Sequence, residues 1–429
     1  MQNAFFSYPR QFVLSLSPES RHLDCLLGRL KREGIVLVEL KRPPKRLRDA
    51  PIALDKLTIG AFRNLENVEL EDLGRINLLV GVNNAGKTSI LEAIAVLQNP
   101  FSPYEWFNAV RTRETRSVGY MPDQMSVLEA IRWMFPISND PMEIENQISP
   151  ITLSSEAHGR SDDLRITCEE INGFIDPETF SKAFAGVRKR DAVEPVEDSG
   201  LLIRASAHIS QGLLSPEYFE QEWVLWSQLG LRTEMGARRP TGNLQFLAPY
   251  AHRNSPANLR LLSEASKFGG RDDIDALLRD LDPRISGVEI ITSDDGRYPK
   301  IAIRMRDGAL MPQGIFGDGV RRALSIALAI RKCANGILLI DEIEAALHVS
   351  ALDRVYRWLD QAANSYNVQI FATTHSLEAI EAVISSVAPN SHSDLSGYAL
   401  GDAKEGGVKR YTGGMLHRLV RQRGLDIRY

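Results

Sequence analysis

The segment 81–90, GVNNAGKTSI, constrains the fold of this chain more than any other part of the sequence. It fits the pattern G-x-x-x-x-G-K-[ST]. It lies between an apolar run at 76–80 with strand character and a run with helical spacing, SILEAIAVL. A glycine-rich loop that leads from a strand into a helix points several backbone N–H groups at one place, and the helix dipole adds partial positive charge there. The sequence therefore predicts a strand–loop–helix unit that binds phosphate.

Two side chains of this loop extend the prediction to a nucleoside triphosphate with a metal ion. Lys87 is expected to reach the β- and γ-phosphates, and the hydroxyl of Thr88 is expected to contact Mg²⁺. The alternative is a chance match in a glycine-containing loop. The strand before the loop and the helix after it argue against that alternative.

The composition is that of an ordinary globular protein, and 429 residues leave room for two or three domains. A net charge of −4 indicates no global affinity for nucleic acid or membrane, so any basic surface must be local. The three cysteines, Cys25, Cys168 and Cys333, are far apart and odd in number, which favours a reducing compartment without a zinc site. The start lacks signal-peptide features and no apolar run approaches the ~20 residues of a membrane span, so we expect a soluble, cytoplasmic protein.

A second part of the nucleotide site is predicted at 337–342, ILLIDE, where four apolar residues of a buried strand end in two carboxylates. Asp341 is expected to bind Mg²⁺, directly or through water. Glu342 is expected to lie opposite the γ-phosphate and polarise the attacking water. Two solvated acids at a strand end are the alternative, and the preceding phosphate loop favours the catalytic assignment.

A third part follows another apolar strand, in the sequence FATTHS. His375 comes 33 residues after Glu342, on the next predicted strand. A histidine beside a catalytic carboxylate can contact the γ-phosphate and sense hydrolysis, whereas a lone histidine in a loop usually has no such role. The position on the neighbouring strand makes His375 a candidate catalytic residue.

A fourth part is the segment 314–330, GIFGDGVRRALSIALAI, in which two glycines lead into a predicted helix with Arg321 and Arg322 in its first turn. The N-terminus of such a helix is a second anion site. Phosphate-loop proteins that close a dimer over ATP use a segment of this kind to hold the γ-phosphate of the opposite subunit. An ordinary glycine loop with Asp318 as the helix cap is the alternative.

The order of these motifs resembles that of the ABC-type ATPase head, and their details resemble a narrower family. LTIGAFRNLENVELEDLGRINLLVGVNNAGKTSILEAI, GDGVRRALSIALAI, LLIDEIEAALH and FATTHSLEAIEA are similar to the ATPase domain of the OLD (overcoming lysogenisation defect) nucleases and their stand-alone relatives. The resemblance covers about 54–429, apart from much of 105–240. It implies an α/β P-loop NTPase fold with an ABC-type head, in which helices flank a mixed sheet. In that family the head dimerises through ATP and is coupled to a Toprim nuclease.

The resemblance also assigns the site residue by residue, with ATP and Mg²⁺ as cofactors. It makes Gly81, Asn84, Gly86, Lys87, Thr88 and Ser89 the phosphate loop (Walker A), Gly317 and Gly319 the signature, Asp341 and Glu342 Walker B, His375 the switch histidine and 345–348 the D-loop. Thr88 and Asp341 would hold the metal, and Glu342 and His375 would be catalytic.

We expect four segments along the chain. They are a short N-terminal extension with a basic linker (1–50), an ATPase N-lobe with Walker A (51–105), an insertion or helical lobe (106–240), and an ATPase C-lobe with the signature, Walker B and His loop (241–429). The helical interpretation of the third segment rests on SVLEAIRWMF and PEYFEQEWVLWSQLG, beside one expected strand, DLRITCEEI. Basic clusters at 41–48, 188–190 and 238–239 are expected to be mostly solvated, with nucleic-acid contact as the alternative.

Three features depart from the family pattern. Gly317 stands where a serine is usual, so its hydroxyl contact to the opposite γ-phosphate would be missing, which suits a slow switch better than fast hydrolysis. No glutamine-containing Q-loop is assigned. The chain runs for 54 residues after His375 without a D-x-D sequence, less than a Toprim nuclease domain needs, so we expect the nuclease to be a separate protein.

The sequence leaves three functions open. The first is a homo-oligomeric sensor ATPase of a bacterial anti-phage system that works with a separately encoded effector, expected to be a Toprim nuclease, and responds to a phage-derived trigger. The second is a RecF-like repair ATPase that binds DNA. FATTHS and DEIEAALH favour the first. A transporter ATPase is disfavoured because no LSGGQ sequence occurs.

Overall fold

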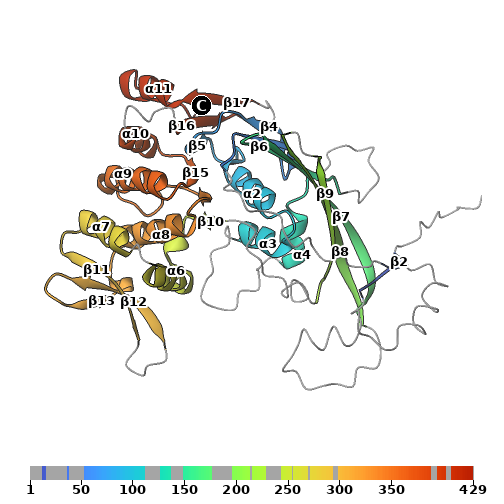
Figure 1. The fold of residues 1–429 in the computed structure, drawn as a ribbon, viewed down its shortest axis with the longest axis horizontal. Helices are drawn as coiled ribbons and strands as arrows, with labels where there is room; N and C mark the ends of the chain where they lie inside the picture. Colours follow the sequence, from blue (N-terminus) through green and yellow to red (C-terminus); the bar gives the residue numbers. More distant parts are fainter. Residues whose placement is uncertain are drawn as a thin grey trace, which may run out of the picture.

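The fold was analysed in a computed structural model of the chain (Figure 1). The structure describes residues 12–15, 36–37, 53–111, 126–136, 148–175, 196–212, 215–228, 243–253, 255–268, 271–292, 298–387, 394–401 and 407–428. The basic clusters at 41–48, 188–190 and 238–239 and Cys25 lie outside these residues.

The central sheet has six described strands, in the order β10-β14-β15-β5-β16-β17. Their bounds are Leu244–Leu247 (β10), Ile337–Ile340 (β14), Gln369–Thr374 (β15), Ile76–Gly81 (β5), Leu395–Leu400 (β16) and Val408–Thr412 (β17). The first five are parallel and β17 is antiparallel to β16. The four strands in the middle are buried along their whole length, as expected for parallel strands covered on both faces.

The two faces of this sheet belong to two hydrophobic cores. On β5, Leu78 and Val80 point into one core, and Leu79 points into the other. The first core is closed by a stack of helices at the left of Figure 1, and the second by α2 and an antiparallel sheet. The described helices are α2 (Lys87–Gln98), α3 (Pro103–Arg111), α4 (Val127–Arg132), α6 (Ser255–Phe268), α7 (Arg271–Leu281), α8 (Asp318–Lys332), α9 (Val349–Ser365), α10 (Leu377–Ser386) and α11 (Gly413–Leu416), with short 3₁₀ turns η3 (Ala251–Arg253) and η4 (Gln313–Ile315) and a π-helical turn η6 (His417–Gln422).

Two further sheets flank the central one. A sheet of eight described strands contains β1 (Phe12–Ser15), β2 (Val36–Leu37), β3 (Lys56–Phe62), β4 (Leu65–Leu70), β6 (Ile151–Ala157), β7 (Arg160–Ile175), β8 (Val196–Gln211) and β9 (Glu217–Trp226). A smaller antiparallel sheet contains β11 (Ile285–Thr292), β12 (Pro299–Met305) and β13 (Leu310–Pro312). A turn at 63–64 joins β3 to β4, which pair antiparallel, and β11 pairs antiparallel with β12.

The expectation of a helical lobe at 106–240 is wrong for most of its described residues. Helices α3 and α4 are present, but the described residues within 148–228 lie mostly in strands. Glu217–Trp226, most of the segment read as a helix, forms β9. Its aromatic and β-branched side chains suit a strand, and β9 pairs with β8 over ten residues. Because β6 pairs with β3, these strands extend the sheet of the N-lobe. The exact borders of the four segments stay a prediction.

No helix in the described part of the chain is long and apolar enough to cross a bilayer. Cys168 and Cys333 are buried free thiols.

Candidate functional site

The glycine-rich loop connects β5 to α2, and its backbone explains two of its glycines. Gly86 directly precedes α2 with a φ of 87°, and a Cβ there would overlap the side chain of Leu65. Gly81 has a φ of 150°, and a Cβ there would lie 2.8 Å from the carbonyl oxygen of Leu400. Asn84 also has a left-handed backbone, with a φ of 65°. Glycine is the residue type that adopts such conformations without strain, so the loop depends on it.

Lys87 lies folded over its own loop. Its Nζ donates hydrogen bonds to the carbonyl oxygens of Gly81 and Val82, both at 2.8 Å. Burial lowers the pKa of Lys87, while the carboxylates of Asp341, Glu344 and Glu342 act in the opposite direction. An ammonium held by two carbonyls inside an anion-binding loop is placed to exchange those partners for phosphate oxygens.

Asp341 joins three elements at the carboxyl end of β14. Its side chain accepts a hydrogen bond from Thr88 Oγ1 of α2 at 3.0 Å and one from Thr373 Oγ1 of β15 at 2.7 Å. The residue is 8% exposed. Thr373 was not predicted as a site residue. The only sequence signal for it is its place at the end of the strand beside β14.

Glu342 directly follows Asp341 in a left-handed conformation with a φ of 47°. Its backbone N–H donates to Thr373 Oγ1 at 2.8 Å, which fixes the turn after the strand. Burial is the main reason that its pKa is raised, and the neighbouring Asp341 charge adds to this shift. A carboxyl with a raised pKa at the edge of a cleft has the property required of a general base.

His375 follows β15 and is tied to two other parts of the chain. Its Nδ1 lies 3.4 Å from Glu344 Oε1, and its backbone N–H donates to the same oxygen at 3.2 Å. Arg428, near the C-terminal end of the described residues, donates to the carbonyl oxygen of His375 at 2.7 Å. The imidazole itself is 52% exposed, so it is available to a ligand.

A cleft of about 800 Å³ brings most of the predicted residues together. It is lined by Arg63, Asn64, Leu65, Asn83, Asn84, Gly86, Lys87, Thr88, Ser89, Trp133, Phe135, Asp341, Glu342, Thr373 and His375. Three parallel strands end at this cleft, as is usual for ligand sites of parallel sheets. Its volume lies in the range of small-molecule sites. Gly81 borders the cleft through its contact with Lys87.

The signature glycines are not among the residues that line the cleft. Gly317 is the residue before α8 and a Cβ there would meet nothing within 4 Å; a Cβ on Gly319 would meet only the carbonyl oxygen of Ala346, at 3.5 Å. Asp318 does not cap the helix through its side chain, because its carboxylate pairs with Arg321 at 2.8 Å and with Arg253 at 3.0 Å. The start of α8 therefore lies open.

Arg322, in the first turn of α8, points into the protein interior. It is wholly buried, and its guanidinium donates to the carbonyl oxygens of Ala248 at 2.5 Å and of Asp341 and Glu342, both at 3.2 Å. Burial lowers the pKa of Arg322 to about 10. The sequence offered no signal for this contact, which joins the signature helix to the catalytic turn.

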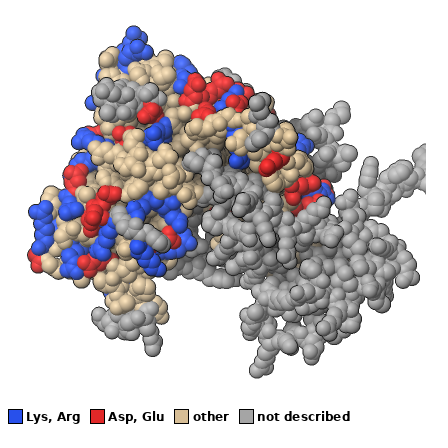
Figure 2. All heavy atoms as spheres, in the orientation of Figure 1, with Lys and Arg blue, Asp and Glu red and all other residues tan. Residues whose placement is uncertain are grey.

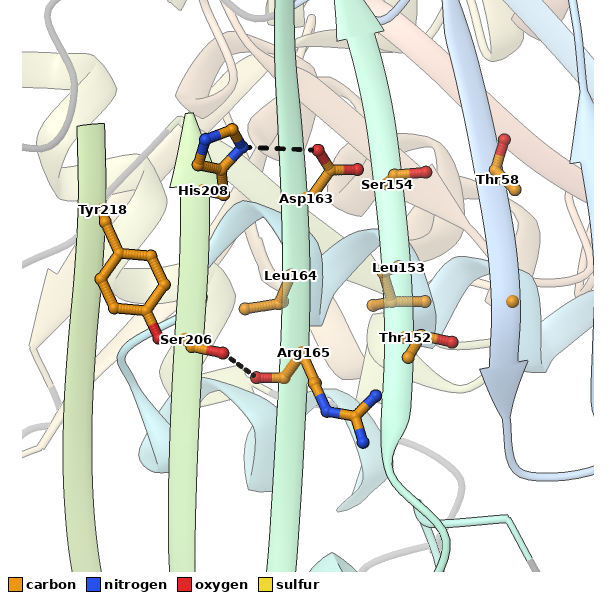
Figure 3. A pocket seen from close by; sticks show the side chains of 11 residues that line it. Thr58, Thr152, Leu153, Ser154, Asp163, Leu164, Arg165, Ser206, His208 and Tyr218 are labelled. Atoms are coloured by element: carbon orange, nitrogen blue, oxygen red, sulfur yellow. Dashed lines mark hydrogen bonds and ion pairs between the residues drawn. The ribbon is translucent and has the colours of Figure 1, made fainter. Parts of the chain in front are cut away.

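A second hollow, of about 300 Å³, lies on the eight-stranded sheet (Figure 3). His208 Nδ1 is 3.9 Å from Asp163 Oδ2, and Ser206 Oγ donates to the Arg165 carbonyl oxygen at 3.3 Å. The figure shows these side chains spaced along neighbouring strands rather than converging on one point. This hollow has no counterpart to the loop and carboxylates of the larger cleft, which is therefore the candidate site.

Two family profiles match the chain on either side of this cleft. Residues 53–199 match the "AAA ATPase domain" family, and residues 228–381 match the family described as "AAA domain, putative AbiEii toxin, Type IV TA system".

Individual relatives point in the same direction. An ATP/GTP phosphatase from Helicobacter pylori is 22% identical over 355 residues, 76% of this chain and 86% of that protein. The Rad50 DNA double-strand break repair ATPase of Saccharolobus solfataricus is 25% identical over 189 residues, 40% of this chain and 21% of its own length. The DNA replication and repair protein RecF of Cellvibrio japonicus is 50% identical over 46 residues, 11% of this chain and 13% of RecF. The last two matches thus span only a small part of those proteins.

Proposed function

We propose a biological role for this chain, which is an ATP-hydrolysing enzyme with AAA-type ATPase segments related to Rad50 and RecF. In the proposed role it is a cytoplasmic sensor or scaffold subunit of a bacterial anti-phage defence system. ATP-dependent assembly holds or releases a separately encoded effector, of which a Toprim nuclease is the expected type. Among OLD-like systems, the ATPase subunit of the PARIS system is the expected counterpart.

The observation that carries the enzymatic part of the proposal is the convergence of three motifs on one cleft. Lys87 and the loop N–H groups would bind the triphosphate. Thr88 and Asp341 would hold Mg²⁺, and they fit that ion because they offer a hydroxyl and a carboxylate that already lie 3.0 Å apart. The metal ion would neutralise charge on the phosphates.

Glu342 would supply the base for hydrolysis. Its carboxylate would accept a proton from the attacking water, and its raised pKa matches that task. His375 would contact the γ-phosphate from the adjacent strand end and report its loss. Because Arg428 and Glu344 hold the His375 backbone, a change at the imidazole would be felt by the C-terminal segment and by the turn after Glu342.

The open start of α8 supports a site shared between two copies. Gly317 and Gly319 would complete the γ-phosphate contacts of the opposite copy, since they do not line the cleft of their own chain. Hydrolysis per molecule is then expected to rise with protein concentration until dimers form. A concentration-independent rate from a strict monomer, measured by phosphate release beside analytical ultracentrifugation, would refute the shared site.

The defence role is supported by the toxin–antitoxin description of the family that matches 228–381. The direct experiment expresses the chain with the product of its neighbouring gene and challenges the cells with a panel of phages. Protection that needs both genes and is lost with Lys87→Ala supports the proposal. Nucleic-acid cleavage by the isolated chain, lost with Glu342→Gln, would refute a separate effector.

A RecF-like repair ATPase is the second candidate, because the match to RecF reaches 50% identity over 46 residues. This role requires ATP-dependent DNA binding. On the face shown in Figure 2, the described Lys and Arg residues are interspersed with Asp and Glu, so that face offers no uniformly basic surface. Tight DNA binding in ATP, together with sensitivity of a deletion strain to DNA damage and no effect on phage, would favour this candidate.

A further inference from the structure

One aromatic side chain in the cleft has no role in the chemistry of the phosphates. Trp133 lines the cleft together with the phosphate loop and is 51% exposed. Trp106, Trp223 and Trp226 are 1%, 4% and 1% exposed. Tryptophan is highly buried on average, so an indole left half open to solvent in a ligand cleft is unusual.

The chain holds Trp133 in this place by several contacts. The residue ends α4, whose start is fixed by a capping box between Ser126 and Glu129. The Trp133 N–H donates to the carbonyl oxygen of Glu129 at 2.9 Å. The next residue, Met134, is fully buried and accepts a hydrogen bond from the backbone N–H of Arg63 at 3.0 Å. The backbone that carries the indole is therefore hydrogen-bonded within α4 and, one residue later, to the β3–β4 turn.

The chemistry of the cleft changes from one group of lining residues to another. The loop 83–89 and the carboxylates supply charge and hydrogen bonds for phosphate and metal. Trp133 supplies exposed aromatic surface beside the buried Leu65 and Phe135, and Asn64 adds an exposed side-chain amide that can both donate and accept. Arg63 is held by the fully buried Glu92, with Nε and Oε2 2.8 Å apart. A flat, neutral, heteroaromatic group fits this wall.

We propose that Trp133 stacks on the base of the nucleotide whose triphosphate is bound by the phosphate loop, and that Asn64 contacts the edge of that base. This proposal rests on the nucleotide site described above. Stacking of a base on an aromatic side chain contributes enough that its loss weakens binding by about 5- to 150-fold. Trp133 is thus a positioning residue that makes the affinity for a nucleotide depend on its nucleobase.

The test compares two ligands on the full chain. ATP and inorganic triphosphate, each with Mg²⁺, are titrated by calorimetry and by tryptophan fluorescence against the wild type, Trp133→Ala and Trp133→Phe. ATP is expected to quench the emission of the wild type, whereas inorganic triphosphate is expected to leave it unchanged. Trp133→Ala is expected to weaken ATP binding about 5- to 150-fold without changing the affinity for inorganic triphosphate. Trp133→Phe is expected to retain most of the ATP affinity.

A matched control is Trp358→Phe, since Trp358 is part of α9, packs against the core and does not line the cleft. It should leave both affinities and the ATP-dependent quenching in place. Equal ATP affinity in Trp133→Ala and wild type would overturn the stacking proposal while leaving the nucleotide site intact. Equal loss of both ligands in Trp133→Ala would also overturn it. Binding of neither ligand to the wild type would overturn the nucleotide site itself, and the stacking proposal with it.

Discussion

The two helices that follow glycine motifs, α2 and α8, begin in opposite environments. The loop before α2 is surrounded by its own chain: Lys87 is held by two loop carbonyls, and Thr88 reaches a carboxylate of β14. At the start of α8, a Cβ on Gly317 would meet nothing within 4 Å. The first motif already has its proposed catalytic partners in the same chain. The start of α8 is where we propose that the γ-phosphate of a second copy binds.

The buried side of α8 nevertheless connects the start of this helix to the residues of the cleft. Arg322 lies five residues after Gly317 and donates to the carbonyl oxygens of Asp341 and Glu342. A displacement of α8 by an opposite subunit would therefore move the turn that carries the catalytic carboxylate. We infer that the cleft beside α2 carries the nucleotide chemistry and that the start of α8 senses a partner. The buried guanidinium of Arg322 connects the two.

The largest expected effect comes from removing the ammonium group of Lys87 from the phosphate loop before α2. Lys87→Ala takes away the point charge in the loop, so ATP binding should become undetectable in a calorimetric titration at micromolar protein. Lys56→Ala is the control, because Lys56 forms surface ion pairs with Glu69 and Glu71 and does not line the cleft. Wild-type ATP affinity in Lys87→Ala would contradict the assignment of this loop as the phosphate-binding loop.

The next largest effect distinguishes ATP binding from ATP hydrolysis in the same cleft. Glu342→Gln preserves shape but cannot accept a proton, so kcat should fall by about 10²- to 10⁴-fold while ATP affinity stays within about twofold. The variant should accumulate as the ATP-bound dimer, which size-exclusion chromatography with ATP can detect. Undiminished turnover would move the base elsewhere, with His375 as the next candidate.

A smaller effect on turnover tests the connection between α8 and the turn that carries Glu342. Arg322→Met leaves three buried carbonyls without their partner, which should cost about 3 kcal/mol of stability and about tenfold in kcat at temperatures where the protein stays folded. Arg322→Lys should restore part of kcat with little change in KM. Lys332→Met on the same helix removes only an exposed ion pair with Glu264 and is the control. A destabilised Arg322→Met with normal kcat would reduce Arg322 to a structural role.

The smallest expected effect is on thermal stability. It comes from the partial burial of the charged carboxylate of Glu342. The pKa of Glu342 is raised in the folded chain, so its ionised form opposes folding once the pH exceeds the pKa of the unfolded side chain. Glu342→Gln should therefore raise Tm by roughly 2 °C at pH 8, and the gain should shrink as the pH falls toward 4. Differential scanning fluorimetry across this range measures it. A gain that grows on acidification would contradict the direction of the shift.

The sequence predicted the parts of the fold in which apolar runs end in motif residues. The strands β5, β14 and β15 and the helix α2 were all expected, because burial on both faces produces continuous apolar segments and the motifs mark where they end. Their ends meet at one edge of a parallel sheet. The cleft containing Lys87, Asp341 and His375 could therefore be anticipated.

Other features depend on long-range packing that the local pattern does not encode. The segment at 217–226 has helix-compatible spacing, but its aromatic side chains suit a strand, and it pairs with β8. Arg322 looks like a surface arginine until the residues after β10 and β14 provide carbonyls for it. Trp133 enters the nucleotide cleft because the β3–β4 turn binds the residue after it. The contacts of Arg322 and of the residue after Trp133 join distant parts of the sequence and leave no local signal.

The most direct test of the shared site mixes two inactive variants. Lys87→Ala removes the lysine of the phosphate loop. Gly317→Trp is chosen to block the signature surface, at a position where an added Cβ meets nothing within 4 Å. Each should be inactive alone, whereas an equimolar mixture contains heterodimers with one intact composite site. The account predicts that mixing restores about a quarter of the wild-type ATPase rate by random pairing of the two chains. A mixture no more active than its components, or a fully active Gly317→Trp alone, would contradict it.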